Sequence, residues 1–297
     1  MAIATTEPLT ERQQRVGAGS ELADLWRRLR RNRAAVVGAG IMVVFVLLAV
    51  LAPVLVPYNP VQGNLNDRLL PFSETHWLGT DELGRDLLSR ILYGARVSLQ
   101  IQIVAVVLAL VIGVLLGSLS GYLGGYVDSL IMRCMDILLA FPGIFLALGI
   151  IAALGPGLLN LMFAAGISSV PQFARIVRAS ILSLKEREFI EAALALGSGS
   201  NRIMFRHLLP NCLAPIIVQS TLRMATVLLT ASGLSFLGLG VQPPMPELGA
   251  MLSNSRSYLI VAPHVATIPG LAIMVVVVGF NLFGDGLRDT LDPRLRQ

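Results

Sequence analysis

The chain contains few side chains whose type and spacing could support catalysis. Its single lysine, Lys185, lies between leucine and glutamate, so the sequence lacks the GxxxxGK[ST] loop that binds the phosphates of ATP. His76 and His264 have no other metal-ligating side chain at a useful spacing. Cys134 and Cys212 lie far apart and form no CxxC pair, and we interpret both as packing residues. We therefore expect no catalytic residue, no metal site and no cofactor bound by this chain.

A few charged residues interrupt runs that are otherwise apolar. Of the eighteen carboxylates, only Asp136 lies clearly inside such a run, and Arg133, three residues away, would share its helix face. We interpret the two as an ion pair; a proton-relay role for Asp136 is the alternative. Arg223, in the stretch IIVQSTLRMATVLLTASG, lies about ten residues from either polar end. It could snorkel, pair with a partner protein, or line a transport pathway and attract the carboxylate of a solute.

The apolar runs are the elements that must position these side chains. Of the 297 residues, 55% are hydrophobic and only 14% are charged. Six runs reach about 20 residues, the length that a helix needs to cross a bilayer. They cover residues 34–56, 97–119, 129–154, 158–177, 213–238 and 265–283. The sequence therefore predicts an all-α integral membrane protein with six transmembrane helices.

Small residues and prolines in these runs indicate how the helices pack. Glycine, alanine and serine recur, as in GSLSGYLGGY and TASGLSFLGLG, and would let helices approach closely. Prolines also occur within the runs, at Pro142, Pro171, Pro215 and Pro269. We therefore expect closely packed helices, some of them kinked.

Basic residues between the runs indicate the orientation of the helices. If the amino terminus is cytoplasmic, the inside holds sixteen lysines and arginines and the outside holds five. Cytoplasmic loops carry such an excess, so we expect both termini in the cytoplasm. This bias accounts for the net charge of +5, and we expect no nucleic acid partner. The first run follows a long polar tail and lacks a small-residue cleavage site, so we expect a retained anchor.

A membrane protein of this kind needs an energy source if it drives transport. The missing phosphate loop excludes ATP hydrolysis by this chain, and a proton or ion relay usually leaves carboxylates in the middle of spans. Asp136 is the only candidate of that type. The energy must come from another polypeptide, or the protein is a channel or ion-coupled carrier that works alone, or a scaffold without a transport role.

One stretch between two runs is too polar to lie in lipid: EREFIEAALALGSGSNRIMFRHLLPN, residues 186–211. Residues 186–196 predict a short amphipathic helix, and Gly197 ends it where a sharp turn is needed. A second helical piece over 202–209 is then closed by Pro210. We expect a helix-turn-helix hairpin with exposed charge; an ordinary helix on the membrane surface is the alternative.

This hairpin resembles the EAA motif of bacterial ABC-importer permeases. The matching residues are Glu191, Ala192, Ala193, Gly197, Leu209 and Pro210. In that family the loop carries a coupling helix that docks in a groove on the ATP-binding subunit. The resemblance implies that these residues, together with Arg187, couple the chain to an ATPase, which binds ATP and magnesium. His207 departs from the family pattern, which often has isoleucine there, but the turn is intact.

Three further segments narrow the resemblance: HWLGTDELGRDLLSRILYGARVSL, SFLGLGVQPPMPELGAML and GFNLFGDGLRDTLDPRL. They look like the C-type subunit of the dipeptide, oligopeptide, glutathione and nickel permeases. Leu248 departs from that pattern, which frequently has tryptophan there. The resemblance implies a type I ABC-importer permease fold in the bacterial cytoplasmic membrane and import of peptides, with nickel as the alternative. It also implies a homologous second permease, two ATP-binding subunits and an extracytoplasmic solute-binding protein.

The segment before the second run is expected to form an interfacial helix outside the membrane. Thr80 would cap this helix, Asp81 would lie in its first turn, and Asp86 and Arg90 would lie on its polar face. The candidates for contact with a solute-binding protein are Thr80, Asp81, Arg85 and Asp86. A purely structural belt is the alternative.

These expectations divide the chain into four parts. Residues 1–33 form a cytoplasmic tail, and residues 34–96 hold the first transmembrane helix and the extracytoplasmic segment. Residues 97–284 form the transmembrane core, which includes the coupling loop 178–212. Residues 285–297 form a second cytoplasmic tail.

Overall fold

The structure, a computed structural model, describes residue 27 and residues 29–291. In this part of the chain the regular structure is helical, apart from one isolated bridge between Thr80 and Asp86. The helices are α2 (Arg33–Leu55), α3 (Leu87–Leu123), α4 (Gly125–Leu139), α5 (Gly143–Leu154), α6 (Leu158–Ile167), α7 (Val170–Lys185), α8 (Glu188–Ala195), α9 (Ser200–Arg202), α10 (Leu209–Asn211), α11 (Leu213–Phe236), α12 (Leu248–Ser255) and α13 (Pro263–Leu291). Three further segments are not α-helical: the 3-10 helices η1 (Leu65–Asp67) and η3 (Arg256–Tyr258), and the π-helix η2 (Ile203–Leu208). Most of the predicted tail 1–33 and the end of the tail 285–297 lie outside the described residues.

Four helices are long and apolar enough to cross a membrane: α2, α3, α11 and α13. Helices α4 and α5 meet the same criterion only together, and they are bent by 90° relative to each other. The described residues therefore contain four single-helix spans, or five if the bent pair is counted as one. The all-α prediction is confirmed, and four of the six predicted runs correspond to single helices.

The predicted run 129–154 is divided into two helices at Pro142. Helix α4 ends at Leu139, because Pro142 has no amide hydrogen with which to continue it. Pro142 then occupies the N-cap position of α5. The expectation of a bent helix is confirmed at this position. Pro269 lies inside α13 and Pro215 in the first turn of α11, and neither residue ends its helix.

A second break divides the predicted run 158–177 into α6 and α7. Ser168 and Ser169 lie at the break, and both hydroxyls donate to the carbonyl of Ala165 at 3.0 Å. Side-chain bonds of this kind compete with the helical hydrogen bonds of the backbone. Pro171 follows in the first turn of α7, where its missing amide hydrogen is tolerated. Helix α7 then extends beyond the predicted run to its end at Lys185.

Glycines on one face of α3 bring its backbone against α7. Gly113, Gly117 and Gly121 follow one another at intervals of four residues. A Cβ atom added at Gly117 would lie only 2.5 Å from the carbonyl oxygen of Ala174, and one at Gly113 would lie 2.4 Å from the Cβ of Phe173. Close approach supplies the packing contacts that hold helices together in lipid. The predicted role of the small residues is confirmed here.

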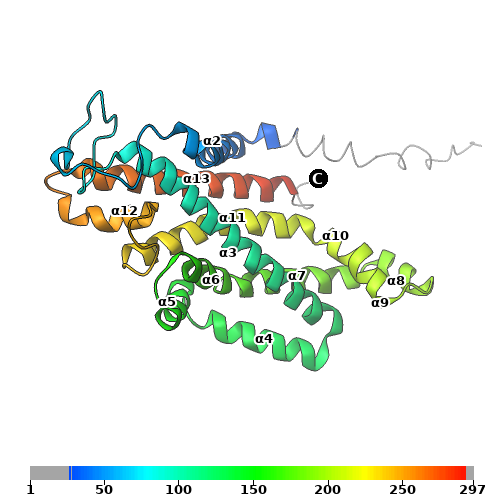
Figure 1. The fold of residues 1–297 in the computed structure, drawn as a ribbon. Helices are drawn as coiled ribbons and strands as arrows, with labels where there is room; N and C mark the ends of the chain where they lie inside the picture. Colours follow the sequence, from blue (N-terminus) through cyan, green and yellow to red (C-terminus); the bar gives the residue numbers. More distant parts are fainter. Residues whose placement is uncertain (1–26, 28, 292–297) are drawn as a thin grey trace, which may run out of the picture.

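The two ends of the bundle carry different structures. Helix α12 and the loop between α2 and α3 lie at one end, and α8, α9 and α10 lie at the opposite end (Figure 1). The start of α2 meets the last turns of α13, where a Cβ atom added at Gly286 would lie 2.3 Å from the Cβ of Ala35. Phe45 and Phe280 join the same two helices edge to face, with ring centroids 6.3 Å apart. Helices α2 and α13 therefore pack as a pair.

Candidate functional site

The predicted hairpin is present directly after α7. Helix α8 ends at Ala195, and Gly197 has a φ of 77°, the left-handed conformation that favours glycine. The amides of Gly197 and Ser198 donate to the carbonyls of Leu194 and Ala193 at 2.9 and 3.0 Å. These bonds satisfy the end of α8 and turn the chain towards α9 (Figure 1). The amphipathic helix and the glycine turn expected from the sequence are confirmed.

The second arm of the hairpin is longer than predicted. Helix α9, η2 and α10 follow one another without a gap over 200–211. Pro210 was expected to close this arm, but it lies inside α10, which continues to Asn211. The turn η2 is π-helical, which widens the helix before the proline. The prediction that Pro210 ends the helix is therefore wrong.

One face of the hairpin packs against α7. Ile190 of α8 and Ile203 and Leu208 of η2 are buried in one cluster with Val177 and Ile181 of α7. A well-packed cluster of this kind moves as a unit, because interiors are close-packed. Displacement of the hairpin would therefore be passed to α7.

The opposite face of the hairpin combines charge with large apolar side chains. Glu191 is exposed, and so are Phe205 (70%) and Leu196 (87%). Charged groups are costly in lipid, whereas an exposed apolar patch in water marks an interaction site. Of the seven proposed coupling residues, five are exposed, one is half-buried and one is buried: Arg187, Glu191, Ala192, Gly197 and Pro210, then Leu209, then Ala193. This face fits the surface of another protein.

Arg223 lies in the middle of a span, as the sequence predicts. It is the eleventh of the 24 residues of α11, and it is half-buried. With the described residues it forms no ion pair. An arginine at such depth costs about 2.5–3.5 kcal/mol on insertion scales, so its charge needs a partner or water. All three roles considered for Arg223 are compatible with this environment.

Asp136 pairs with a different arginine from the one predicted. Its carboxylate accepts a hydrogen bond from Arg175 of α7 at 2.6 Å, whereas Arg133 of its own helix is exposed. Asp128, eight residues earlier on α4, accepts two bonds from Arg178, both at 2.6 Å. The expected pair within α4 is therefore wrong, because α7 packs beside α4 and brings its guanidinium groups to the carboxylates.

The segment before α3 is a tight turn and not an interfacial helix. Helix α3 begins at Leu87, and its cap is Asp86, which accepts from the amide of Ser89 at 2.8 Å. Thr80, the predicted cap, donates to the carbonyl of Asp67 and accepts from the amide of Leu70 at 2.8 Å. The predicted helix start is therefore six residues too early.

A buried ion cluster stabilises this turn. Asp81 Oδ2 lies 2.6 Å from Arg85 Nε and 3.0 Å from Arg90 Nε, and Glu82 lies 3.0 Å from Arg85. The candidate contact residues Thr80, Asp81, Arg85 and Asp86 are all buried. Buried side chains cannot form a docking surface. The alternative of a structural belt therefore replaces the predicted contact with a solute-binding protein for these residues.

Glu247 is a buried carboxylate that the sequence did not single out. It caps α12, accepting bonds from the amides of Gly249 and Ala250 at 3.0 and 2.8 Å, and Ser98 of α3 donates to it at 3.2 Å. Complete burial raises the pKa of Glu247, although these hydrogen bonds oppose the shift. The signal in the sequence was an acidic residue directly before a short helical pattern in ELGAML.

The histidines and cysteines have structural surroundings. Nδ1 of His76 lies 2.9 Å from Asp86, and Nε2 of His264 lies 3.1 Å from the backbone carbonyl of Leu70 in the loop between α2 and α3. In the described part of the chain, no group of three or more His, Cys, Asp or Glu side chains is placed to hold a metal ion. Cys212 is buried, as expected for a packing residue. Cys134 is exposed, so its interpretation as a packing residue is wrong for the described chain.

Comparison with known proteins places the chain in a family. Residues 113–297 match the model of the binding-protein-dependent transport system inner membrane component. Residues 20–71 match the N-terminal TM domain of oligopeptide transport permease C. Together, these two models match 237 of the 297 residues.

Individual relatives agree with this assignment. The dipeptide transport system permease protein DppC of Alkalihalophilus pseudofirmus is 50% identical over 279 residues, which are 94% of this chain and 92% of the relative. The glutathione transport system permease protein GsiD of Salmonella typhimurium is 48% identical over 277 residues, 92% of this chain and 90% of the relative. A chain of the MetNI methionine ABC transporter, solved in inward facing conformations, shares the fold with a TM-score of 0.56 and 20% identity, covering 69% of this chain and 98% of that one.

These relatives are transport components and not enzymes. Their membrane location agrees with the apolar helices described above. The chain belongs to the family of binding-protein-dependent transport system inner membrane components, as a C-type permease subunit of a bacterial ABC importer that crosses the inner membrane several times.

Proposed function

We propose that this subunit forms half of an ATP-driven pathway that imports peptides, such as dipeptides, oligopeptides or glutathione-like solutes. The names of its relatives, dipeptide and glutathione permeases, support this substrate class. The structural observation that carries the proposal is the hairpin at the end of α7. Its exposed face carries Glu191, Phe205 and Leu196 and fits a groove on an ATPase subunit. The proposed coupling residues are Arg187, Glu191, Ala192, Ala193, Gly197, Leu209 and Pro210.

The proposed assembly has a homologous second permease, two ATP-binding subunits and an extracytoplasmic solute-binding protein. ATP and magnesium bind to the ATPase subunits, because this sequence has no phosphate loop. Helices α2 and α4 expose large apolar side chains, such as Val54 (84%) and Leu130 (67%). Lipid or the second permease would cover these faces.

The proposed topology places both termini and the hairpin in the cytoplasm, with a type I core over residues 97–284 and a coupling loop over 178–212. The start of α2 and the last turns of α13 meet, which supports a common side for the two termini. The excess of arginine on this side supports the cytoplasmic assignment. Residues 34–96 would then supply the first span and the extracytoplasmic segment, and 1–33 and 285–297 the two tails.

Arg223 is proposed as a weak, transient contact for the carboxylate of a passing peptide. Its planar guanidinium group can bind a carboxylate through two parallel hydrogen bonds. The absence of an ion pair with the described residues leaves the group available for such a contact. A tight site would hold back a solute that must leave, so we expect little effect on binding affinity.

Charge reversal in the hairpin tests the proposal. In the assembled, reconstituted transporter, Glu191→Arg should insert normally but lose substrate-stimulated ATP hydrolysis and uptake, since a reversed charge in a buried interface costs about 2–5 kcal/mol. Glu74→Arg is the matched control, with the same charge change at an exposed carboxylate in the loop at the opposite end. Normal stimulated hydrolysis in Glu191→Arg would refute the coupling role. Uptake that needs no ATPase would favour a channel or carrier instead.

A further inference from the structure

Helix α4 is held to the bundle by little apolar burial. Of its fifteen residues, only Met135 is fully buried. Large apolar side chains on the same helix are exposed, among them Leu130 (67%) and Ile137 (64%). Contacts other than core packing must therefore help to fix the position of α4.

Two arginines of α7 supply such contacts. Arg178 donates from Nε and Nη2 to the two carboxylate oxygens of Asp128, each at 2.6 Å, and Ser120 of α3 donates to the same carboxylate. Arg175 donates to Asp136 at 2.6 Å. Both arginines reach from α7, which carries the hairpin, to α4. Helix α4 adds only Met135 to the fully buried core, and three of its other apolar side chains are partly buried against that core: Ile131, Met132 and Leu138.

A third basic residue extends this line of contacts to the end of α7. Lys185 donates to the backbone carbonyl of Tyr122 at 3.1 Å, and its ammonium lies 5.5 Å from the centre of the Tyr122 ring. Lys185 is the last residue of α7, three residues before α8 begins. The basic side chains of α7 therefore contact the last turn of α3 and helix α4 over the stretch from Arg175 to Lys185.

The two ion pairs differ in strength. The side chains of Arg178 and Asp128 are 32% and 18% exposed, whereas those of Arg175 and Asp136 are 52% and 59% exposed. Solvent screens an exposed pair, which then contributes little. The pair of Arg178 and Asp128 is also bidentate, which fixes the relative orientation of the two helices. This pair is therefore the main electrostatic connection between α7 and α4.

We propose that Asp128 and Arg178 are positioning residues that transmit movement of the hairpin to α4. The proposal rests on the proposed coupling of the hairpin to an ATPase. Movement of α8 reaches α7 through the buried cluster around Ile190 and Ile181, and it reaches α4 through the ion pair. Because Met135 is the only fully buried residue of α4, the helix can follow α7 with little repacking of the core.

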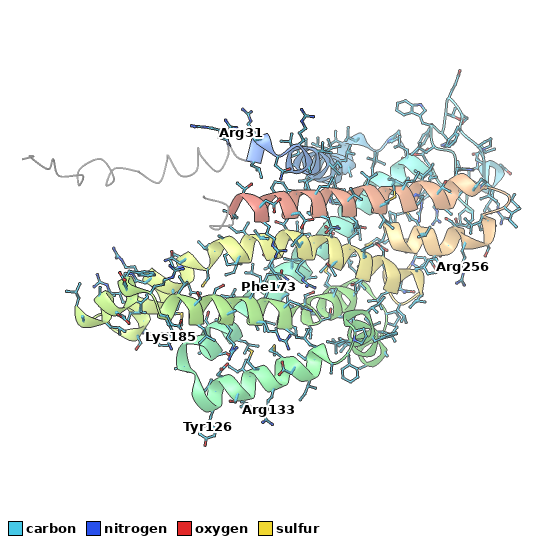
Figure 2. The ribbon with its side chains drawn as sticks, turned by 180° about the vertical axis from the view of Figure 1, so that it is seen from behind. Arg31, Tyr126, Arg133, Phe173, Lys185 and Arg256 are labelled. Carbon is cyan, nitrogen blue, oxygen red and sulfur yellow. The ribbon has the colours of Figure 1, made fainter. Side chains whose placement is uncertain are left out.

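The test uses the complete transporter in proteoliposomes, with two readouts: the amount of ATPase subunit retained and the solute imported per ATP hydrolysed. Asp128→Arg and Arg178→Asp should each retain the ATPase but import about tenfold less solute per ATP, as expected for partners in direct contact. The double variant, which combines Asp128→Arg with Arg178→Asp, should recover most of the solute imported per ATP hydrolysed. Arg133→Asp, which makes the same charge change on an exposed side chain of α4 that points away from the bundle, should match the wild type (Figure 2).

Several results would overturn the proposal. Import and hydrolysis that fall in proportion would indicate a merely structural pair, and so would a double variant no better than the single variants. If a reversed charge prevents insertion, Arg178→Lys replaces it; this variant keeps the charge but loses the bidentate geometry, so an unchanged ratio would also refute the proposal. Failure of the proposed function is distinguishable, because the wild-type protein itself would then retain no ATPase.

Discussion

Substitutions at Gly197 test whether the backbone conformation of the hairpin turn, and not a steric contact of the side chain, limits coupling. The residue has a φ of 77°, and a Cβ atom added to it would meet nothing within 4 Å. A side chain therefore fits, and the cost of a substitution comes from the backbone conformation alone. For residues other than glycine and asparagine, the left-handed conformation costs about 1–2 kcal/mol.

This cost sets the expected size of the effect. Gly197→Ala should lower the ratio of the native turn to other turns by a factor of about 5–30, which corresponds to 1–2 kcal/mol. Gly197→Val should be worse, because a β-branched residue rarely adopts a positive φ. Gly197→Asn should stay close to the wild type, because asparagine tolerates this conformation.

The assay is substrate-stimulated ATP hydrolysis by the reconstituted transporter, with equal amounts of inserted protein. The rates should follow the order glycine, asparagine, alanine, valine. Rates of ATP hydrolysis that are the same in all three variants as in the wild type would refute the argument that the turn conformation limits coupling. A loss in Gly197→Asn as large as that in Gly197→Val would instead indicate that any side chain blocks a contact.

Three further predictions test other parts of the structure. Gly117→Leu should lower the thermal midpoint of the solubilised protein, because overpacking against α7 costs about 1–3 kcal/mol. Gly40→Leu is the control and should leave the midpoint unchanged, because a Cβ atom added at Gly40 meets nothing within 4 Å. Equal midpoints for the two variants would contradict the tight packing of α3 against α7. Burial raises the pKa of Glu247 above its ordinary 4.5, so its stabilising contribution is complete below that value and is lost as the pH rises through the raised pKa. The thermal midpoint of Glu247→Gln should therefore lack this pH dependence. The same dependence of the midpoint on pH in Glu247→Gln and in the wild type would contradict the prediction. Arg223→Ala and Arg223→Lys should lose the preference for a free peptide over its C-terminally amidated form, and an unchanged preference and rate would make Arg223 structural.

The hairpin could be predicted because its signals are local. The amphipathic pattern of 186–196 and the glycine after it fix a helix and its end within a dozen residues. The same is true of the long apolar runs that became α2 and α13. The burial of Ile190 against α7 could not be predicted, since nothing in the local pattern says which helix covers it.

The errors come from contacts between distant segments. Thr80 is a residue type that often caps helices, but its hydroxyl accepts a hydrogen bond from the amide of Leu70 in the loop. Asp86 caps α3 instead. Asp136 has an arginine at the right spacing on its own helix, but α7 offers Arg175 across a helix contact. A single sequence reports spacing along the chain, whereas these partners are chosen by packing between helices.

The central claim is that this subunit imports a peptide with energy supplied by a separate ATPase. The most direct measurement reconstitutes the chain with its second permease, the two ATPase subunits and the solute-binding protein, and follows uptake of a labelled dipeptide into proteoliposomes. The account predicts uptake only when ATP is present on the side of the hairpin and the binding protein is on the opposite side. Uptake driven by an ion gradient, without ATP or the ATPase subunits, would contradict it.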